Sequence, residues 1–94
     1  MATLIKTDGT RSEVSPKNKK KGFTCQELYA LIGCDLIEHV GPNAKGESLI
    51  VDEEGKLKDH LELNAEATQW FRESFGPYDL IFGNAVLVSN AEFK

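Results

Sequence analysis

Three consecutive carboxylates give this chain its best candidate for chemistry. Asp52, Glu53 and Glu54 follow an apolar run over residues 49–51, and divalent cations such as Ca²⁺ bind several oxygen ligands. The run lacks the alternating oxygen donors of a calcium loop, and adjacent side chains in a tight turn point in different directions. We therefore expect no metal ion and no cofactor. We interpret Asp52, Glu53, Glu54 and the neighbouring Lys56 as a partner-binding group on an exposed turn.

The two histidines are the other candidates for catalysis. His39 follows Glu38 and His60 follows Asp59, and a histidine beside a carboxylate is able to act as an acid or a base. No serine or cysteine near either histidine belongs to a nucleophile motif. The sequence therefore predicts no catalytic residues and a protein that is not an enzyme. The enzymatic alternative is a metal-dependent enzyme that uses the acidic turn.

A lysine-rich segment over residues 16–22 is the third charged feature. Because so many like charges cannot pack into a core, we expect an exposed, flexible loop. Lysines in such a loop are able to contact phosphates, and the candidates are Lys17, Lys19, Lys20 and Lys21. The run has no aromatic residues that would stack on bases, so we expect no direct nucleic-acid binding. A small-ligand binder that sequesters a nucleotide signal, at an oligomer interface, is the alternative function.

Length and charge restrict the class of partner. The chain has 94 residues, which predicts a single small domain over 1–94 with a C-terminal tail over 89–94. The formal net charge is −4, but residues 1–22 hold six basic and two acidic side chains, so the remainder has a charge of −8. An acidic body repels nucleic acid and suits a protein with a basic surface.

The sequence also indicates a location. No apolar run approaches the length needed to span a bilayer, and the N-terminus lacks the pattern of a signal peptide. Cys25 and Cys34 are not spaced as a metal or redox pair. We therefore expect a soluble cytoplasmic protein with reduced thiols and no membrane contact. The sequence leaves a homo-oligomer open.

Two helices are predicted from their ends. Thr24 and Glu27 can form a capping box at the start of a helix that Gly33 ends in the left-handed conformation. Asn64 can cap a second helix, which ends at Gly76-Pro77. Each helix has an apolar stripe on one face.

The remaining apolar runs predict strands. We expect hairpins between 3–7 and 10–14 and between 34–40 and 47–52, followed by a turn with Gly55 in the left-handed conformation and a short third arm over 56–58. Residues 78–82 and 85–88 flank Gly83-Asn84 either as a tight hairpin or as one bulged strand. The predicted fold class is α+β, a mostly antiparallel sheet of about five strands with two helices packed on one face.

The order of these parts resembles domain-of-unknown-function family 3846 over residues 24–88. The matching segments are the helix with Leu28 and Ile32-Gly33, the strand that ends Ile37-Glu38, the run Leu49 to Leu57, Asn64 with Ala67-Thr68, and Asp79 to Ala85.

The resemblance implies a genetic context. Members of the family are short proteins encoded largely by phages, plasmids and other mobile elements. It therefore implies a mobile-element accessory protein in the cytoplasm of a bacterial host. By analogy with other small acidic proteins of that origin, we expect a non-enzymatic inhibitor of a host protein, such as a counter-defence protein of the anti-CRISPR type.

Overall fold

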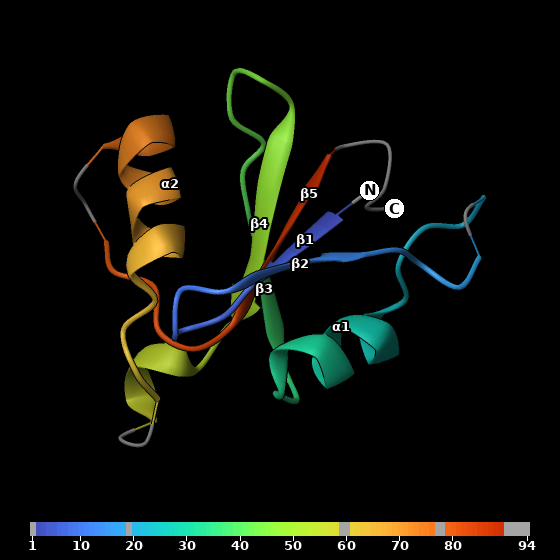
Figure 1. Cartoon of the computed structure of the whole chain (residues 1–94), viewed down its shortest axis with the longest axis horizontal. Helices are drawn as coiled ribbons and strands as arrows, with labels where there is room; N and C mark the ends of the chain where they lie inside the picture. Colours follow the sequence, from blue (N-terminus) through green and yellow to red (C-terminus); the bar gives the residue numbers. More distant parts are fainter. Residues whose placement is uncertain (1, 19, 59–60, 77–78, 90–94) are drawn as a thin grey trace.

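A computed structural model describes residues 2–18, 20–58, 61–76 and 79–89, apart from the side chain of Lys56. The fold is an antiparallel sheet with a helix on each side (Figure 1). Its elements in chain order are β1 (Ala2–Ile5), β2 (Arg11–Val14), α1 (Cys25–Ile32), β3 (Ile37–Val40), β4 (Glu47–Asp52), the short 3-10 helix η1 (Gly55–Leu57), α2 (Ala65–Phe75) and β5 (Ala85–Ser89).

The five strands lie in the order β2-β1-β5-β4-β3, and every pair is antiparallel. The predicted hairpins β1-β2 and β3-β4 are confirmed. The last strand, β5, lies between the two hairpins and joins them into one sheet (Figure 1). The α+β class and the antiparallel sheet with two helices are therefore confirmed, and β2 and β3 are left as the two edges.

The prediction that both helices pack on one face is wrong. Residues that alternate along the central strands divide between two cores, because successive side chains of a strand point to opposite faces. One core lies under α1 and contains Leu4, Ile50, Val86 and Leu28. The other lies under α2 and contains Ile5, Leu49, Val51, Ala85 and Ala67. The central strands are apolar on both faces, so each face requires a helix to cover it.

The start of α1 is built as predicted. The Thr24 hydroxyl accepts a hydrogen bond from the amide of Glu27, and the Glu27 carboxylate accepts one from the amide of Thr24. Gly33 ends the helix in the left-handed conformation (φ 82°). The other carboxylate oxygen of Glu27 accepts a hydrogen bond from the amide of Lys17. Glu27 therefore ties the start of the lysine-rich segment to the helix.

These amides lower the pKa of Glu27 below its ordinary value, the Lys17 amide most strongly. A lowered folded-state pKa means that ionised Glu27 stabilises the fold above its ordinary pKa, and that this contribution disappears as the pH falls through the folded-state pKa. We expect Glu27→Gln to lower the melting temperature at neutral pH but not at acid pH, as measured by thermal unfolding. The control Glu62→Gln removes an exposed carboxylate that caps no helix, and it should leave the melting temperature unchanged at both pH values. An equal loss at both pH values would contradict this role.

Two predicted strands are absent from the described residues. Residues 56–58 do not form a third arm, because Gly55 begins η1. Gly55 is also not left-handed. A Cβ atom there would lie 2.9 Å from the carbonyl oxygen of Phe82, so the position requires glycine because the chain passes close to it. Within the predicted strand 78–82, residue 78 lies outside the described residues, and Phe82 forms only an isolated bridge with Leu63.

Asn64 explains why the segment before β5 is held without being a strand. Its side chain is fully buried and donates hydrogen bonds to the carbonyl oxygens of Ile5 (2.9 Å) and Gly83 (3.0 Å). Its Oδ1 atom accepts the amide of Ala67, which caps α2 as predicted. Its own amide donates to the carbonyl of Ile81. One residue thus fixes β1, α2 and residues 81–83 relative to one another.

Candidate functional site

The candidate site is a groove of about 460 Å³ on the α2 side of the sheet, beside the edge strand β3. One wall is formed by β3 and β4, and the other by residues 79–82, which Asn64 holds through the carbonyl of Ile81 and which pass close to Gly55. We call it the acidic groove. Its lining residues are Glu38, His39, Val40, Val51, Asp52, Glu53, Gly55, Phe71, Asp79, Leu80, Ile81 and Phe82.

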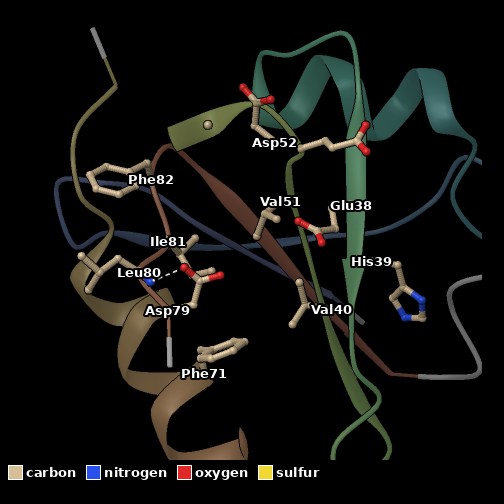
Figure 2. A pocket seen from close by; sticks show the side chains of 12 residues that line it. Glu38, His39, Val40, Val51, Asp52, Phe71, Asp79, Leu80, Ile81 and Phe82 are labelled. Atoms are coloured by element: carbon tan, nitrogen blue, oxygen red, sulfur yellow. Dashed lines mark hydrogen bonds between the residues drawn. The ribbon is translucent and has the colours of Figure 1, made fainter. Parts of the chain in front are cut away.

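Carboxylates from separate segments meet at the acidic groove. Glu38 comes from β3, Glu53 from the turn after β4, and Asp79 from the segment before β5. Figure 2 shows the carboxylates of Glu38 and Asp79 turned toward the same space. The Asp79 Oδ1 atom accepts the amide of Leu80, which fixes that side chain. Among the described lining residues there is no lysine or arginine.

The floor of the groove is apolar. Val51 and Ile81 are buried members of the α2-side core, and Val40 and Phe71 pack against that core. Phe82 belongs to the wall of the groove that residues 79–82 form (Figure 2). Carboxylates around an apolar and aromatic floor suit the planar guanidinium of arginine, which pairs with carboxylates through two parallel hydrogen bonds and stacks on rings.

Asp52 does not share the exposure of its neighbours. It is 6% exposed, and its carboxylate accepts hydrogen bonds from the Lys58 ammonium (2.7 Å) and the amide of Glu54 (2.9 Å). The hydrogen bond that Lys58 donates to Asp52 raises the pKa of the Lys58 ammonium, so Lys58 stays charged. The Asp52 carboxylate is therefore engaged inside the protein, and its predicted place on an exposed turn is wrong. Register explains this, because Asp52 ends β4 opposite Ile37 on the α1 side.

The other residues of the predicted acidic turn separate from one another. Glu53 is exposed and lines the groove, whereas Glu54 is exposed but does not line it. The backbone of Lys56 lies in η1, and its side chain is outside the described part of the structure. Partner binding by Glu53, Glu54 and Lys56 stays a prediction.

Of the two acid and base pairs considered for catalysis, the one in the described part of the structure, Glu38 with His39, is not brought together. Glu38 and His39 are adjacent in β3, so their side chains lie on opposite faces, and in Figure 2 the His39 ring points away from Glu38. Asp59 and His60 lie outside the described residues. Among the residues that are described, no group of three His, Cys, Asp or Glu side chains is arranged to hold a metal ion.

The cysteines are both free, Cys25 on the surface and Cys34 in the α1-side core. Burial, followed by the nearby Asp52 carboxylate, raises the pKa of the Cys34 thiol. A raised pKa keeps a thiol protonated and unreactive. Cys34 is therefore a structural core residue.

In the lysine-rich segment Lys17, Lys20 and Lys21 are exposed, whereas Gly22 is buried, and Lys19 lies outside the described residues. The backbone amides of its three described lysines already have partners, since those of Lys20 and Lys21 donate to Asn18 Oδ1 and that of Lys17 donates to Glu27. A phosphate there would meet lysine side chains without a cradle of free amides, and beside a carboxylate. Phosphate contact by Lys17, Lys19, Lys20 and Lys21 stays a prediction that this geometry does not favour.

Sequence patterns did not identify Glu38, Asp79 and Phe71 as groove residues. Asp79 lies 41 positions after Glu38 in the chain, and Phe71 belongs to the apolar stripe of a helix. Their meeting depends on the long-range packing of residues 79–82 against β3 and β4. The only local signal was the position of Glu38 in an alternating strand.

These features define an α+β protein with an acidic groove beside an open sheet edge. The chain belongs to the family described as Domain of unknown function (DUF3846), whose model matches residues 2–94. The match extends the predicted resemblance over nearly the whole chain. No curated protein and no solved structure matches the chain. In the described residues, no helix is long and apolar enough to cross a membrane.

Proposed function

We propose that this protein is a non-enzymatic binding protein that recognises a basic segment of a host protein through the acidic groove and thereby inhibits that protein. The single observation behind the proposal is the convergence of Glu38, Glu53 and Asp79 on one groove whose described lining contains no lysine or arginine. A concentration of one charge sign over low-dielectric walls attracts the opposite charge.

The apolar floor narrows the class of ligand. A divalent cation needs several oxygens around one point, whereas these carboxylates line the groove together with the apolar residues Val51, Ile81 and Phe71. A basic side chain with an apolar or planar stem satisfies both parts of the groove, because it buries its stem while its charge meets the carboxylates. Arginine on an exposed protein segment is therefore the proposed anchor.

The phage and plasmid context implied by the family resemblance points to a bacterial host protein as the target, in the host cytoplasm. Such a target has a basic groove or loop, as nucleic-acid-binding proteins do. The proposed role of this protein is counter-defence, in which it inhibits a host defence protein of that kind. Occupation of that basic surface by the acidic groove would exclude the target's own anionic ligand.

Affinity capture from bacterial lysate tests the proposal. We expect the tagged protein to retain a host protein whose basic segment accounts for the contact. Because the attraction is electrostatic, retention should fall as the salt concentration of the wash rises. The tagged Glu38→Arg/Glu53→Arg variant is the control and should retain none of it. Equal retention by this variant, or retention that salt does not weaken, would contradict the proposal.

A further inference from the structure

The edge strand β2 offers a second interaction surface, remote from the acidic groove. Among the described strands, β2 pairs only with β1. The carbonyl oxygen of Thr10 accepts a hydrogen bond from the amide of Lys6, so Lys6 and Thr10 form a hydrogen-bonded pair of the antiparallel ladder. Hydrogen-bonded and non-hydrogen-bonded pairs alternate along an antiparallel ladder, so Leu4 and Ser12 form the next hydrogen-bonded pair. The amides and carbonyls of Arg11 and Glu13 therefore point away from β1, toward the open side of β2.

The outward-facing residues have opposite charges. Arg11 and Glu13 are exposed and lie on the same face, since they are two positions apart in a strand. A second copy related by a two-fold axis would approach antiparallel, and three registers would join outward groups. Arg11 facing Arg11, or Glu13 facing Glu13, sets like charges opposite each other. Only the register centred on Ser12 sets Arg11 of each copy opposite Glu13 of the other, in both pairs at once.

We propose that this protein forms a homodimer through antiparallel pairing of β2 with β2 of a second copy, centred on Ser12, so that two five-stranded sheets become one continuous sheet. Charged edge residues usually prevent such pairing. Here the charges are self-complementary, so they select one register. The interface is isologous, as closed two-fold dimers require.

The other face of β2 supports the same occupant. An apolar groove of about 670 Å³ lies beside β2 on the α1 side, and Val14, Phe23 and Leu31 contribute to its lining. The same register sets Thr10 of the second copy opposite Val14, at the rim of this groove. It also brings the Asp8-Gly9 turn of one copy toward the start of the lysine-rich segment of the other, which are of opposite charge.

Sedimentation equilibrium with charge-exchanged variants tests the dimer. In a dimer of the Glu13→Arg variant, the new arginine of each copy lies opposite Arg11 of the other copy. In a dimer of the Arg11→Glu variant, the new glutamate of each copy lies opposite Glu13 of the other copy. This variant also carries Glu66→Gln, because Arg11 pairs with Glu66 within the wild-type monomer. Each should dimerise at least about tenfold more weakly than the wild type, since two cross-strand pairs change sign. An equimolar mixture should recover wild-type affinity, because all facing charges are then opposite.

Two further variants separate pairing from charge and from the acidic groove. Glu13→Pro removes an outward amide while leaving the bonds to β1 intact, so it should be a folded monomer by circular dichroism and sedimentation. Glu38→Arg changes the net charge by the same amount as Glu13→Arg but lies at the opposite edge, so it should dimerise like the wild type. A wild type that stays monomeric through the micromolar range, or a mixture no tighter than its components, would overturn the proposal without bearing on the groove.

Discussion

Replacement of Asn64 by alanine is expected to lower the free energy of unfolding by about 4 kcal/mol, the largest effect of any single substitution proposed for this protein. Loss of the cap of α2 costs about 1 kcal/mol. The change also leaves the buried carbonyls of Ile5 and Gly83 without their donor, at about 1.5 kcal/mol each. Since small domains are stable by about 5–15 kcal/mol, the variant should unfold at much lower denaturant concentration, as measured by urea titration.

Two variants distinguish this account from a simple capping role. Asn64→Asp retains the capping oxygen but turns a carboxylate toward two carbonyl oxygens, so we expect it to be at least as unstable as Asn64→Ala. Asn18 also accepts two amides, but it lies in the exposed lysine-rich segment, so Asn18→Ala should cost about 0.5 kcal/mol or less. A stable Asn64→Asp variant would show that Asn64 acts only as a cap.

The second large effect concerns binding. Neutralising the acidic groove with Glu38→Gln and Glu53→Gln should weaken binding of the captured partner by about 100-fold. Each glutamate is expected to accept a charged hydrogen bond worth about 1.5 kcal/mol, and about 1.4 kcal/mol is a factor of ten. Titration calorimetry at low salt measures the change.

The matched control for that variant is Glu62→Gln with Glu73→Gln. Both residues are exposed and lie outside the acidic groove, so this control changes the net charge equally without touching the site. We expect its affinity to remain close to that of the wild type. If the two double variants bind equally weakly, net charge rather than the groove determines binding.

Local signals in the sequence were sufficient for the elements with strong ends. Thr24, Glu27 and Gly33 specify α1, and Asn64 specifies the start of α2, because capping depends on residues only a few positions apart. The two hairpins also follow from an Asp-Gly turn and a six-residue loop, each between two β-type segments. The helices appear in the structure with nearly the predicted bounds, whereas β3 begins at Ile37 instead of residue 34 and β1 ends at Ile5 instead of residue 7.

The arrangement of the elements was harder to predict. The apolar runs of β4 and β5 indicate strands that are buried on both faces of the sheet. Helices on one face alone would leave the other apolar face exposed, so this pattern favours a helix on each face. Residues 80–82 are also apolar, but Asn64 and Thr68 satisfy backbone groups of Ile81 there. The backbone amide of Asn64 and the side chain of Thr68 thus replace the partner strand that a local pattern predicts.

The site was predicted only in part. An acidic surface that includes Glu53 follows from the sequence, but the division between buried Asp52 and exposed Glu53 depends on where β4 ends and on Lys58. The contribution of Asp79 depends on tertiary packing alone. Sequence therefore indicated the chemistry of the surface, and folding determined which carboxylates share a groove.

The most direct test of the acidic groove is an amide chemical-shift titration of isotope-labelled protein with a short peptide in which arginine and leucine alternate. The account predicts saturable shifts confined to residues 38–40, 51–55 and 79–82, and none with the matched peptide in which neutral citrulline replaces arginine. Shifts centred elsewhere, or equal shifts with the citrulline peptide, would contradict it.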